Sequence, residues 1–329
     1  MGRIVLVILL VIMLIFLGNF VMDIIRRRKT DERKYNKKEM FLAFGLLAPS
    51  AILAFLFVLL PIFFSLGFGF TDFVLSEPDI NFVGFDQFSR LIDEFKHHYP
   101  IYYAFRNTAL FVVLVVPLQI GLALLLALFC NNKRRGTTIF KICFFAPVAV
   151  SLTITCYLWQ VILSGSDSSV INNILHFFGI ESQDFLRQPN SIIIWMVVIS
   201  AWQGCGFQML IFLSALGNIR KDLYEAAAID GANAFRRFKT VTLPGLKPTF
   251  LFILITVFVG ACRVIIQPRL LSPDAGRGDN SITLSLFMVD KATATDGGIG
   301  YSCAIAFVLT ILLGTITLIQ RRLLGEKKR

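Results

Sequence analysis

The chain has 329 residues, of which 56% are hydrophobic and 33 are Phe. Its mean hydropathy of +0.73 means more apolar surface than a soluble core encloses, and its uncharged runs are long enough to cross a bilayer. The net charge of +11 raises the question of nucleic acid, but the basic residues gather at alternate ends of successive apolar runs. That pattern is typical of Lys and Arg held on the cytoplasmic side of a membrane. We therefore predict an all-α integral membrane protein and exclude a soluble or nucleic-acid-binding one.

The first apolar run, residues 4–25, comes before a basic cluster that starts at Arg26. A cleaved signal peptide has its positive charge before the apolar run and a small-residue cleavage site after it. The order here is reversed, so we predict an uncleaved helix whose N-terminus lies outside. Residues 1–40 would then form an extra N-terminal helix and a basic cytoplasmic linker.

Six further apolar runs predict the rest of the fold. At 1.5 Å per residue, about 20 residues match a hydrocarbon thickness of about 30 Å. We thus expect about seven transmembrane helices, the extra one plus a six-helix core in a domain at 41–320, before a basic cytoplasmic tail at 321–329. The six runs are 41–68, 108–129, 139–163, 192–216, 249–266 and 301–319.

Between these runs the chain is predicted to form external loops at 71–103, 164–190 and 267–300. Three prolines lie inside runs, where each removes a backbone donor and is expected to interrupt the helix. Such interruptions suit a moving pathway but are also common in membrane helices generally. The three are Pro61, Pro117 and Pro147.

Several polar and aromatic side chains lie within the runs, where contact with lipid is unfavourable. One interpretation is hydrogen bonding between helices and anchoring at the interface. The other is a polar, aromatic-walled passage for a hydrophilic solute, and for Arg263 a helix-end position that reaches outward is a third. The candidates for this substrate path are Gln119, Tyr157, Gln160, Trp202, Gln203, Gln208 and Arg263.

The sequence contains no GxxxxGK[ST], HExxH or GxSxG motif, and its apolar runs are nearly free of Asp and Glu. These features argue against ATP hydrolysis by the chain itself and against an ion-driven carrier. The six Cys form no CxxC pair and lie within or beside apolar runs. We interpret them as small core residues rather than metal ligands or disulfide partners.

A charged, alanine-rich stretch lies between the fifth and sixth core runs, on the predicted cytoplasmic side. Residues 222–230, DLYEAAAID, are predicted to form a helix that ends at Gly231 in a left-handed conformation. A second short helix is predicted to follow and to stop at Pro244. The chemistry allows either a bare face for a close partner or an amphipathic loop on lipid headgroups.

The spacing in this stretch resembles the EAA loop of permease subunits in binding-protein-dependent ABC importers. Glu225, Ala226 and Ala227 are followed by three residues and Gly231, and nine residues later comes the sequence VTLP at 241–244. The family pattern has I-x-L-P there, so only Val for Ile departs. We identify a coupling loop at 220–248, in which the resemblance gives roles to Glu225, Ala226, Ala227, Asp230, Gly231, Leu243 and Pro244.

Further segments are similar to the carbohydrate branch of those permeases. They include INFVGFDQFSRLI after the first core run and GIGYSCAIAFVLTIL in the last. Asp86 stands where Asn is usual, Arg220 stands where I-P often precedes the loop, and 272–278 lacks the family's T-x-G-G-P run. The extra N-terminal helix has no counterpart in the six-span form.

The resemblance implies a chain that is not an enzyme and binds no cofactor or metal directly, with ATP and Mg²⁺ used by a partner ATPase. It implies a second permease subunit, which we expect to be a different chain, two ATPase subunits and an external solute-binding protein that delivers a carbohydrate. The location would be a prokaryotic cytoplasmic membrane, with the C-terminus inside. Alternatives are an importer of a sugar phosphate, peptide or amine on the same plan, a membrane scaffold or insertase, and, third, a secondary carrier.

Overall fold

A computed structural model describes residues 37–75, 80–131, 136–188, 191–294 and 298–324. Within these ranges every element of regular structure is a helix, which confirms the predicted all-α class. The predicted first span at 4–25 and most of the basic linker lie outside the described residues.

Five helices of the described chain are long and apolar enough to cross a membrane, and a bent pair gives a sixth span. This number matches the six predicted core runs. The first span is built from three consecutive helical pieces, and the bent pair is α6 with α7. The spanning helices are α2 (Lys37–Ala54) with η1 (Phe55–Leu59) and α3 (Leu60–Phe68), α5 (Pro100–Asn131), α6 (Thr137–Ala149) with α7 (Leu152–Leu163), α9 (Ser191–Gly217), α12 (Leu243–Cys262) and α15 (Gly298–Leu324).

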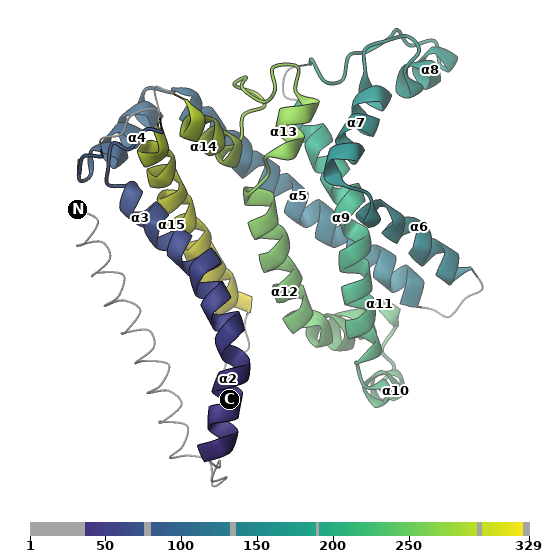
Figure 1. Cartoon of the computed structure of the whole chain (residues 1–329). Helices are drawn as coiled ribbons and strands as arrows, with labels where there is room; N and C mark the ends of the chain where they lie inside the picture. The colour runs from purple at the N-terminus through teal and green to yellow at the C-terminus, as the bar shows by residue number, and fades with distance from the viewer. Residues whose placement is uncertain (1–36, 76–79, 132–135, 189–190, 295–297, 325–329) are drawn as a thin grey trace.

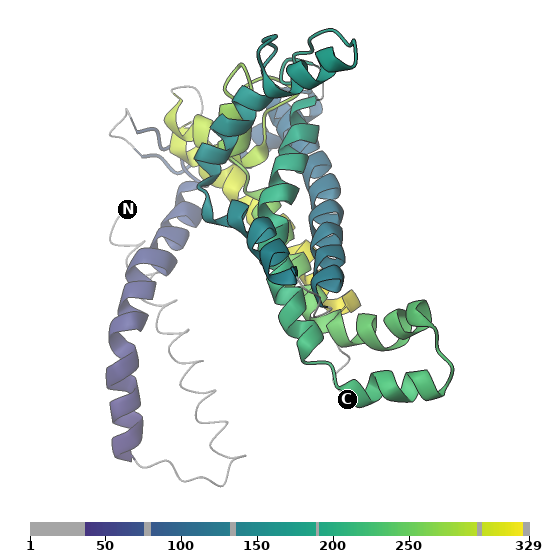
Figure 2. The same cartoon turned by 90° about the vertical axis from the view of Figure 1, so that its right-hand side faces the viewer.

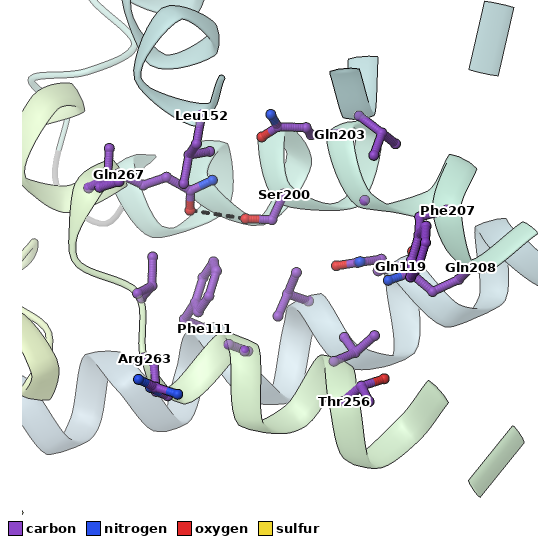
Figure 3. A pocket seen from close by; sticks show the side chains of 18 of the residues that line it. Phe111, Gln119, Leu152, Ser200, Gln203, Phe207, Gln208, Thr256, Arg263 and Gln267 are labelled. Atoms are coloured by element: carbon purple, nitrogen blue, oxygen red, sulfur yellow. Dashed lines mark hydrogen bonds between the residues drawn. The ribbon is translucent and has the colours of Figure 1, made fainter. Parts of the chain in front are cut away.

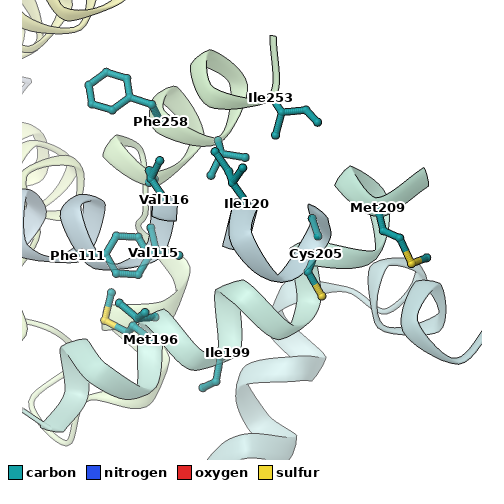
Figure 4. Close-up of a cluster of buried hydrophobic side chains, with 14 of the residues drawn as sticks. Phe111, Val115, Val116, Ile120, Met196, Ile199, Cys205, Met209, Ile253 and Phe258 are labelled. Atoms are coloured by element: carbon teal, nitrogen blue, oxygen red, sulfur yellow. The ribbon is translucent and has the colours of Figure 1, made fainter. Parts of the chain in front are cut away.

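The main hydrophobic core lies where α5, α9 and α12 pack together (Figure 4). Each of these helices contributes fully buried apolar side chains, for example Val115 from α5, Met196 from α9 and Ile253 from α12. Because lipid is as apolar as these side chains, the contact is stabilised by close van der Waals packing rather than by removal of apolar surface from water. This three-helix contact is therefore the rigid centre around which the rest of the chain is arranged.

The first core span is peripheral by comparison. The most apolar window of Gly45–Phe68 has 0% of its residues buried. Its α3 part packs against α15, where Ser65 Oγ lies 3.4 Å from Cys303 Sγ, and Figure 1 shows α3 and α15 side by side. The remaining apolar faces of this span require lipid or another subunit as a neighbour.

The interruption predicted at Pro147 in the run 139–163 is confirmed, because the chain bends by 100° between α6 and α7. Pro147 removes a backbone donor near the end of α6, and Val150 and Ser151 take extended conformations. The α6 backbone also packs closely on α9, since a Cβ on Gly206 would overlap the Phe144 carbonyl oxygen. The bend therefore has both a local cause and a packing cause.

The other prolines are accommodated within helices. Pro61 follows the π turn η1, and Pro117 lies inside α5, which continues without a break. The prediction that Pro244 stops a helix is wrong: it lies in the first turn of α12, directly after the π turn η2 (Phe238–Thr242). Proline has no backbone N–H, but an amide in the first turn of a helix has no acceptor within that helix, so no hydrogen bond is lost. The candidate span accordingly begins at Ala234 rather than at the predicted 249.

Shorter helices lie at the two ends of the bundle. At one end are α4 (Asp86–Lys96), α8 (Val170–Phe177), α13 (Ile266–Leu271) and α14 (Leu284–Thr293), which apart from the first residue of α13 lie within segments predicted as external loops. At the opposite end are α10 (Lys221–Ile229) and α11 (Ala234–Arg237), as Figures 1 and 2 show. The α15 helix continues to Leu324, into the predicted tail.

Candidate functional site

The predicted coupling loop folds as two short helices joined by a tight turn. Helix α10 ends at Ile229, and Gly231 has a φ of +73°. The Ala232 amide donates to the Ala227 carbonyl at 2.9 Å, which closes the helix end. The predicted helix and its left-handed ending at Gly231 are therefore both confirmed.

The second half of the loop is fastened to the first by a side-chain hydrogen bond. The hydroxyls of Tyr224 in α10 and Thr242 in η2 lie 2.9 Å apart. The Asn233 side chain accepts a bond from the Arg236 amide at 2.8 Å and so begins α11. These contacts hold α10 against the residues that lead into α12, a membrane-spanning helix.

The surface of this loop is exposed and carries two large apolar side chains among charged ones. Ile229 is 87% exposed and Phe235 is 74% exposed, whereas α10 and α11 contain no buried residue. Exposed apolar side chains next to charged ones are typical of a protein–protein contact. Of the predicted coupling residues, Ala227 is half-buried, and Glu225, Ala226, Asp230, Gly231, Leu243 and Pro244 are exposed.

A second candidate site is a hollow of about 560 Å³ in the centre of the bundle (Figure 3). We call it the central hollow. Its walls come from α5, α9 and α12, with the α6–α7 bend and the start of α13 closing one side. Its volume falls within the range of about 300–1,000 Å³ typical of ligand pockets. Its polar lining residues are Gln119, Ser200, Gln203, Gln208, Thr256, Arg263 and Gln267.

The polar groups of the central hollow are partly held by the protein. The Ser200 hydroxyl donates to Gln267 Oε1 at 3.0 Å, as Figure 3 shows. The Gln203 amide donates to the Val150 carbonyl at 3.0 Å and so stabilises the α6–α7 bend. Gln208 Oε1 is buried and has no partner among the described residues. The hollow therefore combines fixed amide groups with at least one free acceptor.

The structure brings together four of the seven predicted path residues. Gln119, Gln203, Gln208 and Arg263 all line the central hollow. Arg263 directly follows the last residue of α12 and is exposed, as the helix-end interpretation predicted.

The other three lie outside the lining. Gln160 donates to the Leu270 carbonyl at 3.1 Å, which is the predicted bond between elements. Trp202 packs edge-on against Trp159 with ring centroids 5.9 Å apart, and Tyr157 is 53% exposed. Whether any of the seven contacts solute stays a prediction.

Three polar residues that line the central hollow were not predicted from the sequence. Ser200 shares a helix face with Gln203, Gly204, Phe207 and Gln208, at the 3–4–7–8 spacing of one stripe. That periodicity could have revealed it. By contrast, Gln267 and Thr256 are placed by the packing of α12 and α13, for which the local sequence carries no signal.

The described residues include no group of three or more His, Cys, Asp or Glu able to hold a metal ion. The six cysteines are free thiols. The features that stand out are therefore the exposed coupling loop and the central hollow, which together define a membrane transport component.

Comparison with known proteins agrees with that class. Residues 99–329 match the family model described as binding-protein-dependent transport system inner membrane component. Because the match covers more than half of the chain, this protein belongs to that family, the permease subunits of ABC importers. It is a multi-pass membrane protein of a transport family, and the predicted resemblance is confirmed.

Individual relatives extend the match. The chain is 30% identical to the arabinooligosaccharides transport system permease protein AraP of Halalkalibacterium halodurans, over 76% of this chain and 78% of that one. It is 31% identical to the lactose transport system permease protein LacF of Rhizobium radiobacter, over 70% and 78%. A bacterial alginate ABC transporter solved with a periplasmic protein has the same fold, with a TM-score of 0.75 and 23% identity over 88% and 98%. The predicted likeness to the carbohydrate branch is therefore confirmed.

Proposed function

We propose that this chain forms one half of the transmembrane pathway of an ATP-driven importer for a sugar or sugar-like solute. The family match over residues 99–329 carries the proposal. The names of the relatives, among them permeases for arabinooligosaccharides and for lactose, support a carbohydrate as the solute.

The lining of the central hollow suits such a solute. Sugar hydroxyls both donate and accept hydrogen bonds, and the side-chain amides of Gln119, Gln203 and Gln208 can do the same. Phe207, which is 52% exposed, adds a flat apolar wall, against which the C–H face of a sugar ring can pack. In our proposal the hollow is the part of the pathway that a solute passes.

We propose that the coupling loop binds a separate ATPase subunit, in which ATP and Mg²⁺ are used. Glu225 and Asp230 would make polar contacts with it, while Ala226 and Ala227 allow close packing and Gly231 makes the turn. Leu243 and Pro244 begin the helix that carries the motion into the membrane. The exposed Ile229 and Phe235 side chains support a protein partner at this end.

The full assembly would contain this chain, a second and different permease subunit, two ATPase subunits and an external solute-binding protein. We place it in a prokaryotic cytoplasmic membrane, with the N-terminus outside and the C-terminus inside. The arrangement supports this orientation, because α10 and α11 lie at the end opposite α4, α8 and α14 (Figure 1).

Purification of the intact assembly from native membranes tests the proposal. We expect an ATPase with a GxxxxGK[ST] sequence to copurify, and ATP inside proteoliposomes to drive uptake of the oligosaccharides that the binding protein retains. ATP-driven uptake of peptides, amines or sugar phosphates instead would replace the carbohydrate assignment. Copurification of partners that lack an ATPase would support the scaffold alternative and contradict the importer.

A further inference from the structure

Arg263 occupies an unusual position, because two hollows share it. It lines the central hollow and also a flanking hollow of about 830 Å³ between α3, α12, α14 and α15. Figure 3 shows its guanidinium across the central hollow from Ser200 and Gln267. A cation at this point faces any solute that enters either space.

Several arginines at this end of the bundle have anionic partners, while Arg106 donates to the side-chain oxygens of Asn107 and Asn280. Arg90 pairs with Glu94 at 2.8 Å, and Arg269 and Arg277 both pair with Asp290. The Arg263 guanidinium has no hydrogen-bond or ion-pair partner among the described residues. The described residues that line the two hollows include no Asp or Glu.

The Arg263 guanidinium is exposed at the end of α12, so it is accessible to a ligand that enters either hollow. The carbonyl end of α12, which Arg263 follows, offers only about half a negative charge. An incoming anion would supply the rest, and a carboxylate matches the planar fork of guanidinium with two parallel hydrogen bonds. The residue is therefore well suited to an anionic group on a solute.

The surroundings of Arg263 specify what carries that anion. Gln203, Gln208 and Gln267 provide side-chain amides around the same space, and amides recognise hydroxyls rather than charges. The combination of one cation with several amides fits a molecule with one carboxylate and many hydroxyls. Such a molecule is an acidic sugar.

Given the proposed transport function, on which this inference depends, we propose that Arg263 is a specificity residue for carboxylate-bearing oligosaccharides. The uronic-acid carboxylate binds the Arg263 guanidinium, and the sugar hydroxyls bind the amides of the central hollow. A neutral oligosaccharide of the same shape makes only the second set of contacts.

The test uses the complete assembly in lipid nanodiscs and two probes, digalacturonate and neutral galactobiose of the same linkage. We expect the acidic disaccharide to bind about tenfold more tightly, as a charge-assisted pair predicts. Arg263→Gln should remove that preference and leave galactobiose binding unchanged, while Arg263→Lys should keep part of it. Arg277→Gln is the matched control: it removes the same charge from an exposed position outside both hollows and should change neither affinity.

Equal binding of the two probes by the wild type, or an equal loss of both in Arg263→Gln, would overturn the inference. So would release of the second permease subunit by Arg263→Gln, since that result would assign the cation to a contact between subunits. ATP-driven uptake of the oligosaccharides selected by the binding protein is measured on the same preparations. If the wild type takes up oligosaccharides but shows no preference for the acidic probe, only the proposed role of Arg263 is contradicted. If the wild type shows no ATP-driven uptake, the proposed transport function itself is contradicted.

Discussion

The coupling loop and the central hollow differ in how the chain builds them. The coupling loop is continuous in sequence, and its helices α10 and α11 contain no buried residue. The hollow takes its walls from α5, α6, α7, α9, α12 and α13, and it borders the main hydrophobic core, with which it shares Phe111, Val115 and Val257. The shape of the loop depends on a few neighbouring residues in the sequence, whereas the shape of the hollow depends on how helices from distant parts of the sequence pack. Substitutions in the loop should therefore impair transport, and substitutions in the hollow should reduce stability.

The largest effect is expected at the turn of the coupling loop. Gly231 has a φ of +73°, and a β-branched residue there is strained by about 1–3 kcal/mol. Gly231→Val should displace the end of α10, reduce ATP-driven uptake by roughly tenfold or more and leave ATP hydrolysis running. Uptake and hydrolysis are measured together in proteoliposomes.

The matched variant is Gly231→Asn, because Asn tolerates the left-handed conformation better than other side chains. It should keep most of the uptake. Normal uptake by Gly231→Val would show that this turn does not participate in coupling. The coupling loop would then no longer differ from the central hollow in its sensitivity to local substitutions.

A smaller effect is expected in the hollow and should appear as lost stability. Gln203→Leu removes the donor to the Val150 carbonyl at the α6–α7 bend. The same substitution removes the bond to Thr155 Oγ1 at 3.3 Å, and loss of the two bonds should lower the free energy of unfolding by about 1–3 kcal/mol. Thermal denaturation of the purified assembly measures this loss. Gln188→Leu, at an exposed external position, is the control and should melt like the wild type. An unchanged melting temperature in Gln203→Leu would mean that the bend is held by other contacts.

The smallest effect is expected from the link between the loop and the membrane. Tyr224→Phe deletes the hydroxyl that lies 2.9 Å from Thr242 Oγ1, a bond that contributes about 0.5–1.5 kcal/mol. We expect a two- to fivefold lower ratio of solute moved to ATP hydrolysed, with membrane insertion unchanged. The ratio is obtained from simultaneous uptake and phosphate-release assays, and an unchanged ratio would make this contact structurally neutral.

The sequence predicted these regions with unequal success for the same physical reason. The helix of the coupling loop and its ending at Gly231 follow from residues within one stretch, and both were predicted. Pro147 predicted an interruption in the fourth core run, but the 100° angle between α6 and α7 depends partly on close packing at Gly206 in a distant helix. The prediction that Pro244 stops a helix was wrong because the π turn before it shifts the backbone hydrogen-bond pattern, so that no bond from residue 244 is required.

The sequence predicted lining residues of the hollow only where a polar side chain interrupts an apolar run. Gln119, Gln203 and Gln208 are conspicuous in apolar runs, and all three line the central hollow. Gln267 is conspicuous only after α13 folds back beside α9, where it meets Ser200. Residues assigned to an external loop by hydropathy can thus contribute to the interior, because chain distance and spatial distance diverge in a bundle of this kind.

Site-specific photo-crosslinking tests the central claim most directly, namely that the coupling loop contacts an ATPase. A benzophenone amino acid replaces Ile229, which is 87% exposed on α10, and in a second preparation Phe177, which is 86% exposed on α8 at the opposite end. Irradiation of intact membranes should join the Ile229 position to a protein that carries GxxxxGK[ST] and should not do so from the Phe177 position. An ATPase adduct from both positions, or from neither, would contradict the account.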